Sequence, residues 1–201
     1  MLSIIHPRYA VKVNELFIKH ELLMDFSRQI NFEEQLYKTN KIWFSSSRTS
    51  LVNELCAQAG NFIKQVNLHV AKMEYFIWRT TDRAQHPHID YINTVLSDSE
   101  TLNLRLNVPV ISSGAVMEWY PVTENSKWVP TNDEEENGKR LSLDITGIDP
   151  CFTMSADSIS FVNTSLPHTI NMSNAVTDRL TVSFIFVKNP LFTNLINQII
   201  V

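Results

Sequence analysis

The stretch Gln85–Tyr91 carries residue types that bind metal ions. His88 and Asp90 are two positions apart, and residues with this spacing on a β-strand point to the same side. Both can therefore reach one ion. A third ligand must come from elsewhere, and His168 follows the strand-like run Ser158–Val162. Two histidines and one carboxylate form the facial triad that binds Fe(II) and leaves positions open for a chelating co-substrate and oxygen.

An arginine follows the distal histidine. Arg179 lies eleven positions after His168, at the head of the strand-like run Leu180–Phe186. On a strand beside the metal ligands, its guanidinium fork can bind a carboxylate through two hydrogen bonds. A single HxD motif is common by chance, and one histidine near a strand end is more often only hydrogen-bonded. The indication of a metal site therefore comes from the joint pattern.

This order of residues resembles the Fe(II)- and 2-oxoglutarate-dependent dioxygenase superfamily: HxD, a distal histidine, and an arginine after ten intervening residues. The resemblance covers well over half of the chain. It implies a double-stranded β-helix of the jelly-roll type, with His88, Asp90 and His168 as iron ligands. It also implies that Arg179 binds the distal carboxylate of 2-oxoglutarate, and that Thr181 stands where several branches have a helping serine.

The chain departs from the family pattern at one turn and offers a second metal pair. The family often has Gly-Asp before the strand of the distal histidine, and this chain has Ala156–Asp157. His86 shares a side with His88, so a shifted pair of these two histidines is an alternative. Pro87 between them and the missing carboxylate make it the poorer choice.

The run Leu102–Val108 alternates without a fault. Its leucines are predicted to pack on N-terminal helices, while Asn103 and Arg105 face the interior of the barrel. The alternative is an edge strand with its polar side in water. A buried guanidinium needs an anionic partner, so Arg105 competes with Arg179 for 2-oxoglutarate, as a lysine near this place does in a JmjC-like branch. The spacing from the distal histidine favours Arg179, and Arg105 or Asn103 would then touch the near carboxylate or the substrate.

The elements that must position these residues follow from periodicity. Apolar residues at helical spacing predict a helix from Val13 to Ile30, a second over Ser50–Lys64 and a short closing helix over Leu191–Val201. Strand-like runs cover 68–79, 86–92, 101–111, 114–122, 141–145, 158–163, 168–172 and 179–187. About eight strands without intervening helices predict a mainly β jelly roll, cupin-like in type. We expect one domain, with helical support over 1–66, the double-stranded β-helix over 67–188 and a helix over 189–201.

The connection Thr123–Arg140 is long and lacks periodicity, which is typical of a lid or of a disordered excursion. Trp128 within it is hard to explain as core and favours a lid over the substrate. Trp119 is expected to line the mouth of the pocket, although aromatic residues in strands are more often core.

Composition excludes several classes of protein. With 44% hydrophobic and 19% charged residues the chain is globular, and its net charge of −4 gives no basic excess for nucleic acid. Only Cys56 and Cys151 are present, and the start MLSIIHPRYA lacks an apolar signal core, so a reducing cytoplasmic setting is expected. Every apolar run is far short of the ~20 residues that span a bilayer.

The leading hypothesis is an oxygenase that uses Fe(II), 2-oxoglutarate and O2 to hydroxylate an unactivated C–H bond, with release of succinate and CO2. The family resemblance favours an amino acid, free or in a polypeptide, as the substrate. One alternative is a cupin-like metalloenzyme that does not use 2-oxoglutarate, and another is a non-catalytic jelly-roll binding module. The implied partners are O2 and a small-molecule or peptidyl substrate, with no membrane and no nucleic acid. No oligomeric state is predicted.

Overall fold

The computed structural model describes residues 2–30, 41–43, 50–80, 87–92, 100–101, 103–131 and 140–200. In chain order its elements are β1 (Leu2–His6), β2 (Ala10–Val13), α1 (His20–Gln29), β3 (Lys41–Trp43), α3 (Ser50–Ile63), the 3-10 helix η1 (Lys64–Val66), β4 (Val70–Trp78), β5 (Tyr91–Ile92), β6 (Glu100–Thr101), β7 (Leu104–Ile111), β8 (Val116–Trp119), β9 (Trp128–Thr131), β10 (Arg140–Leu143), β11 (Phe152–Ser155), β12 (Ser160–Asn163), β13 (His168–Asn171), β14 (Arg179–Phe186) and α4 (Phe192–Ile200). No helix among these is long and apolar enough to cross a membrane.

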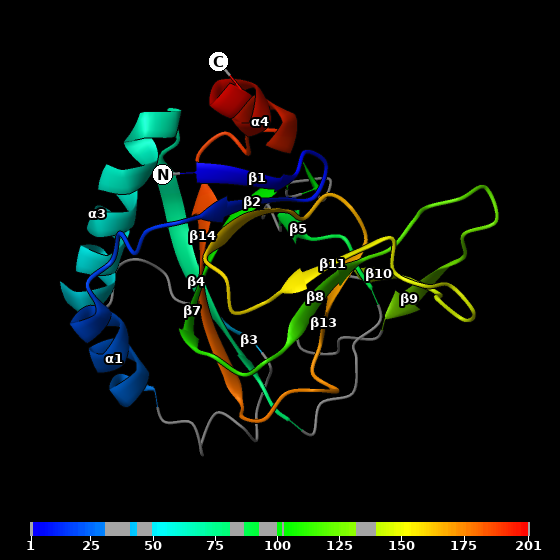
Figure 1. The fold of residues 1–201 in the computed structure, drawn as a ribbon, viewed down its shortest axis with the longest axis horizontal. Coiled ribbons are helices and arrows are strands. Elements are labelled where there is room, and N and C mark those ends of the chain that lie inside the picture. Colours follow the sequence, from blue (N-terminus) through cyan, green and yellow to red (C-terminus); the bar gives the residue numbers. More distant parts are fainter. Residues whose placement is uncertain are drawn as a thin grey trace.

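Two antiparallel sheets face each other (Figure 1). The major sheet has the order β1-β2-β12-β7-β14-β4-β3 and the minor sheet has the order β11-β8-β13. From β11 to β14, consecutive strands alternate between the two sheets. This alternation is the jelly-roll arrangement, so the predicted fold class is confirmed.

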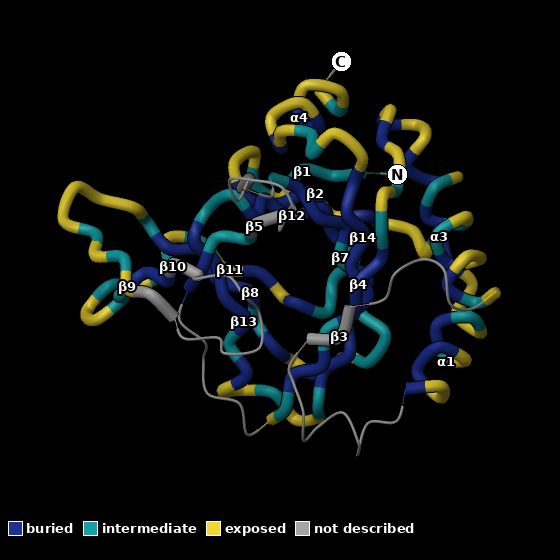
Figure 2. Tube along the Cα trace, turned by 180° about the vertical axis from the view of Figure 1, so that it is seen from behind, coloured by how far each residue is buried: buried dark blue, intermediate teal, exposed yellow. Residues whose placement is uncertain are grey.

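Strand β14 shows how the sequence separates the core from the interior of the barrel. It is buried along its whole length (Figure 2). Leu180, Val182 and Phe184 join the core that residues of α1 and α3 complete. The alternate residues, Arg179 and Thr181 among them, point to the other face, toward the minor sheet. The period of two along β14 therefore places apolar side chains under the helices and polar ones inside the barrel.

The helices cover the outer face of the major sheet. Figure 1 shows α3 and, below it, α1 along that sheet, with α4 at one end of the molecule. Helix α3 buries Val52, Leu55, Ala59, Phe62 and Ile63. The second predicted helix and the closing helix are confirmed to within two residues at each end that the structure describes.

The N-terminal region differs from the prediction of helical support. The sequence pattern predicts a helix from Val13, but the chain forms the hairpin β1–β2 and α1 begins only at His20. The cause is tertiary: β2 pairs with β12 and adds two strands to the major sheet. The predicted runs also omit β3, β9 and β11, because strands of three or four residues are too short to show a period.

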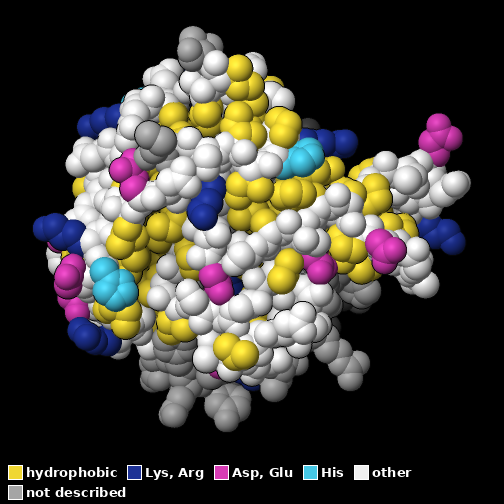
Figure 3. All heavy atoms as spheres, in the orientation of Figure 1, with side chains coloured by type: hydrophobic (Ala, Val, Ile, Leu, Met, Phe, Trp, Pro, Cys, Tyr) yellow, Lys and Arg dark blue, Asp and Glu magenta, His cyan; other side chains and the backbone are white. Residues whose placement is uncertain are grey.

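Charged side chains are scattered over the face of the molecule seen in Figure 3, without a large patch of one sign. This distribution offers no continuous basic surface on that face for a nucleic-acid backbone.

We expect Phe184→Ala to lower the free energy of unfolding by about 3–5 kcal/mol, because Phe184 is 0% exposed between the major sheet and the helices. Urea unfolding followed by circular dichroism measures the change. Val176→Ala is the control, since Val176 is 83% exposed and its truncation should alter stability by less than about 0.5 kcal/mol. A loss below about 1 kcal/mol for Phe184→Ala would contradict this account of the core.

Candidate metal centre

Two histidines from distant parts of the chain lie directly opposite each other. His168 begins β13, and His88 lies on an extended segment that bridges to both His168 and Ser142. The backbone N–H of each histidine donates to the carbonyl of the other at 3.0 Å. Directly opposed residues of an antiparallel pair point to the same face. The two imidazole rings consequently approach to 5.0 Å between centroids.

Asp90 completes a group of three potential ligands. The backbone N–H of Asp90 donates to the carbonyl of Thr164 at 3.1 Å, which fixes the residue beside the two histidines. Its Oδ1 lies 3.4 Å from Nε2 of His88 and 4.0 Å from Nε2 of His168. One ligand atom from each residue lies within 4.8 Å of the others, and the group can hold a metal ion.

His168 is held in the form that binds a metal. Its Nδ1 lies 2.9 Å from the carbonyl oxygen of Leu166. A proton on Nδ1 is donated there, and Nε2 is left with a free lone pair toward Asp90. Burial lowers the pKa of His168 to about 4, against the opposing attraction of the Asp90 carboxylate. The ring is therefore neutral at neutral pH, as coordination requires.

Arg105 stabilises the charge of Asp90. Burial opposes ionisation of this carboxyl group, but the guanidinium of Arg105 and the two histidines outweigh it and hold the pKa of Asp90 below its usual range. Nε of Arg105 donates to Oδ2 of Asp90 at 2.5 Å, and its Nη1 donates to Oε2 of Glu74 at 2.5 Å. The two carboxylates raise the pKa of Arg105 in spite of its burial. Both charged partners of this arginine are thus protein side chains.

The three ligands line a cavity of about 500 Å³ between the two sheets, a volume that includes solvent at its opening. The side chains come from β4, β7 and β14 on one side and from β8 and β13 on the other. The lining consists of Phe76, Trp78, His88, Asp90, Arg105, Asn107, Met117, Thr164, His168, Thr169, Ile170, Arg179 and Thr181.

Arg179 and Thr181 bring unused polar atoms to this cavity. Nη2 of Arg179 donates to the carbonyl of Ala156 at 3.0 Å, but its Nε and the Oγ1 of Thr181 have no hydrogen-bond partner among the described residues. Burial lowers the pKa of Arg179 to about 10, partly offset by Asp157, so the guanidinium stays cationic at neutral pH. A buried polar group without a partner costs roughly 1–3 kcal/mol. An anion with oxygen acceptors would satisfy both groups.

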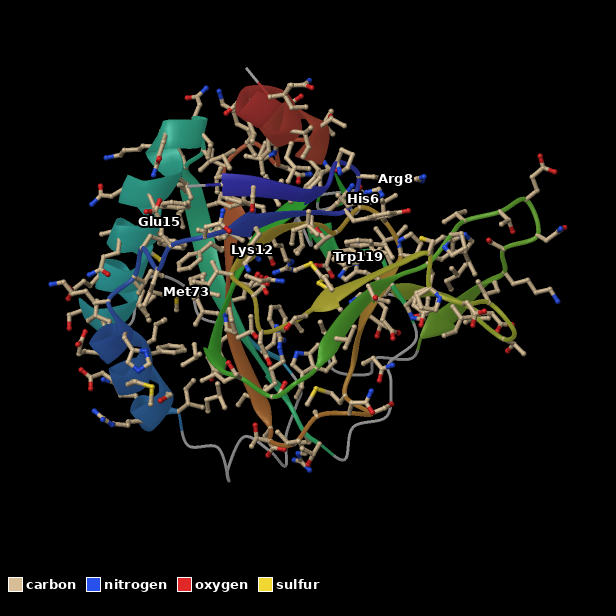
Figure 4. All side chains as sticks on the ribbon, in the orientation of Figure 1. His6, Arg8, Lys12, Glu15, Met73 and Trp119 are labelled. Carbon is tan, nitrogen blue, oxygen red and sulfur yellow. The ribbon has the colours of Figure 1, made fainter. Side chains whose placement is uncertain are left out.

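Three of the residues predicted for the site lie elsewhere. The backbone N–H of Asn103 donates to Oδ1 of Asn189 at 2.9 Å, and Asn103 does not line the cavity. Trp119 is fully buried inside the barrel (Figure 4), where its indole N–H donates to the carbonyl of Asn163 at 2.9 Å. Trp119 is therefore a core residue behind His168, with ring centroids 6.5 Å apart.

Trp128 also lies away from the cavity lining. It begins β9, which pairs with β10 in a hairpin that projects from the body of the molecule (Figure 1). Residues 132–139 of the predicted lid and the alternative ligand His86 lie outside the described residues. The lid remains a prediction.

Sequence reasoning missed Glu74 and the aromatic wall of Phe76 and Trp78. All three lie on one face of β4, opposite β14. The available signal was a carboxylate inside the apolar strand Val70–Trp78, since a buried charge is kept only where a partner faces it.

No family model matches the sequence, and a search of curated proteins gives no match either. Solved structures with a similar backbone include the viral collagen prolyl hydroxylase vCPH from Paramecium Bursaria Chlorella virus-1, which is 9% identical over 85% of this chain and 86% of its own, with a TM-score of 0.49. HygX from Streptomyces hygroscopicus with iron bound is 11% identical over 84% of this chain and 78% of its own, with a TM-score of 0.46. The non-heme alpha ketoglutarate dependent epimerase SnoN from nogalamycin biosynthesis is 12% identical over 85% of this chain and 75% of its own, with a TM-score of 0.46. The functional assignment of this chain therefore rests on the geometry of its own metal centre.

Proposed function

We propose that this protein is an Fe(II)- and 2-oxoglutarate-dependent oxygenase. The observation that carries the proposal is one cavity that holds the His88, Asp90 and His168 group together with the buried, incompletely bonded guanidinium of Arg179. The first feature suits a divalent metal, and the second suits the carboxylate of a ligand that reaches toward that metal.

The donor set fits Fe(II). Two neutral imidazoles and one carboxylate are the ligands of non-heme Fe(II) oxygenases. The hydrogen bond from His168 to the Leu166 carbonyl orients Nε2, and the backbone bond of Asp90 to Thr164 fixes the carboxylate. Fe(II), 2-oxoglutarate and O2 together supply the oxidation of an unactivated C–H bond, with release of succinate and CO2.

Arg179 is the better anchor for the distal carboxylate of 2-oxoglutarate. Arg105 already bonds to Asp90 and Glu74, so a second carboxylate would compete with protein partners for its donors. Nε of Arg179 is free of such partners among the described residues, and the Thr181 hydroxyl lies two positions along the same strand face. A carboxylate bound there would satisfy both orphaned groups.

Apolar side chains line part of the cavity around the metal centre. Phe76, Trp78, Met117 and Ile170 line the same cavity as the ligands. Apolar side chains at this place exclude water and strengthen the electrostatic contacts of Arg179 and Asp90.

For the reaction itself we propose hydroxylation of an amino acid, free or in a polypeptide, with O2 and a small-molecule or peptidyl substrate as partners. The support is the family resemblance of the sequence motifs. We place the protein in the cytoplasm, in keeping with its free cysteines, Cys56 and Cys151. A mass-spectrometric screen of amino acids and peptides for the gain of one oxygen tests the substrate class.

The co-substrate is tested by absorption spectroscopy without oxygen. We expect Fe(II) plus 2-oxoglutarate to give the weak visible charge-transfer band of a keto acid chelated to iron. Fe(II) with succinate is the control and should give no band, because succinate lacks the 2-oxo group. Iron binding without a band would favour the cupin-like metalloenzyme, and no iron binding would favour the jelly-roll binding module.

A further inference from the structure

The two oxygens of Asp90 face different partners. Oδ1 lies toward Nε2 of both histidines, at 3.4 Å from His88 and 4.0 Å from His168. Oδ2 accepts a hydrogen bond from Nε of Arg105 at 2.5 Å. The side chains of Asp90 and Arg105 are only 10% and 8% exposed, so water does not replace this contact freely. One oxygen is therefore available to a metal and the other is occupied.

Arg105 is itself fixed on a rigid part of the molecule. Its Nη1 donates to Oε2 of Glu74 at 2.5 Å and to Oγ of Ser183 at 3.5 Å. Glu74 and Ser183 are directly opposite each other on β4 and β14, and Arg105 lies on β7, the other neighbour of β14. The Ser183 hydroxyl also donates to Oδ1 of Asn107 at 2.8 Å. Three adjacent strands thus determine where the guanidinium points.

Alternating charges lead from the metal centre to the surface. Asp90 bonds to Arg105, Arg105 bonds to Glu74, and Oε1 of Glu74 lies 2.8 Å from Nζ of Lys72. The side chain of Lys72 is 34% exposed, whereas that of Glu74 is 5% exposed. In this series of side chains each buried charge lies beside a charge of opposite sign, and a buried carboxylate requires such a partner.

We propose that Arg105 is a positioning residue that restricts Asp90 to metal binding through one oxygen, with Glu74 holding Arg105 in place. The inference rests on the metal centre of the proposed function. A carboxylate can bind a cation through one oxygen or through two. In a six-coordinate site, three protein donors would leave three positions, which a bidentate keto acid and O2 need. A second Asp90 oxygen would take one of these positions. A guanidinium on Oδ2 prevents this.

A merely structural ion pair makes a different prediction. Replacing a buried ion pair by apolar or neutral groups of similar volume is often neutral for stability. If Arg105 only supports the fold, its neutral replacement should leave the metal and its co-ligands unaffected. If Arg105 positions Asp90, its replacement should leave a protein that still binds metal but has fewer coordination positions open to 2-oxoglutarate and O2.

The test is the double variant Arg105→Met with Glu74→Gln, which removes one positive and one negative charge at nearly constant volume. Co(II) replaces Fe(II) because its visible spectrum reports coordination number. We expect Co(II) to bind, with a spectrum that differs from that of the native protein. We expect 2-oxoglutarate to bind the Co(II) form roughly 10-fold more weakly, because a second Asp90 oxygen competes for a position at the metal; loss of an outer partner of a metal ligand changes metal affinity or activity by roughly 10- to 100-fold. Lys72→Met is the matched control, because it removes a charge from the same series without touching Arg105, and it should change 2-oxoglutarate affinity by less than about threefold.

An unchanged Co(II) spectrum together with native affinity for 2-oxoglutarate would overturn the proposal. If circular dichroism shows that the double variant does not fold, Arg105→Lys takes its place. Its ammonium keeps the charge but cannot reproduce the fork to Asp90 and Glu74, so both readouts should still change, and native values for both would overturn the proposal. Native protein that binds Co(II) but not 2-oxoglutarate would contradict the proposed function instead, and the spectra alone would then decide the role of Arg105.

Discussion

His168→Ala is expected to abolish Fe(II) binding at micromolar metal. The substitution removes one of three protein ligands, and it also removes the imidazole that the Leu166 carbonyl orients toward Asp90. Isothermal titration with Fe(II) in the absence of oxygen measures the loss. His88→Ala should behave in the same way, because His88 occupies the equivalent position across the strand pair.

His69→Ala is the matched control for this experiment, since His69 is exposed and does not belong to the metal-binding group. It should bind Fe(II) as the native protein does. The far-ultraviolet circular dichroism of all three variants should match that of the native protein, which separates loss of a ligand from loss of the fold. Full metal affinity in His168→Ala would refute the assignment of the metal centre.

Arg179→Ala should weaken 2-oxoglutarate about 10- to 100-fold and leave metal affinity nearly unchanged. A charge-assisted hydrogen-bonded pair is worth roughly 1.5–3 kcal/mol, and Arg179 does not belong to the metal-binding group. The measurement is titration of 2-oxoglutarate into the Co(II) form, with Co(II) affinity determined separately.

A second keto acid makes this test specific to the distal carboxylate. 2-Oxopentanoate has the same chain length as 2-oxoglutarate and the same metal-binding end, but it lacks the distal carboxylate. The native protein should bind 2-oxoglutarate more tightly than 2-oxopentanoate, and Arg179→Ala should remove most of this difference. The Arg105 variants should weaken both acids equally, because Arg105 acts on Asp90 rather than on the distal end. If Arg105→Ala removes the discrimination and Arg179→Ala does not, the anchor is on β7.

The succession of strand-like runs without intervening helices, together with the family resemblance, was sufficient to predict the jelly roll. Apolar residues recur with a period of two in Leu104–Ile111 and Arg179–Phe186, because one face of each strand packs under the helices and the other faces the barrel interior. The residue type at each position therefore indicates which face it occupies. The spacing of His88 and Asp90 is local as well, which is why the two could be grouped with the single suitable histidine farther along the chain.

The hairpin β1–β2 could not be read from the sequence in the same way. Val11 and Val13 are buried and lie near the helical pattern that continues to Ile30, so a helix was the natural prediction from local spacing. Pairing with β12, about 150 residues away, decides the structure instead. Local propensity is weak enough for such a long-range pairing to override it.

Only the tertiary structure decided which partners Arg105 and Arg179 have. Both are buried arginines on inward-facing strand positions. The spacing from His168 favoured Arg179 as the anchor but gave no partner for Arg105. The register of β4 against β14 and β7 brings Glu74 to Arg105, and the segment of Asp90 supplies a second carboxylate. Arg179 receives only a backbone carbonyl as hydrogen-bond acceptor among the described residues. Which arginine is paired with protein carboxylates and which is not depends on contacts between residues far apart in the chain. A one-dimensional pattern of residue types does not contain those distances.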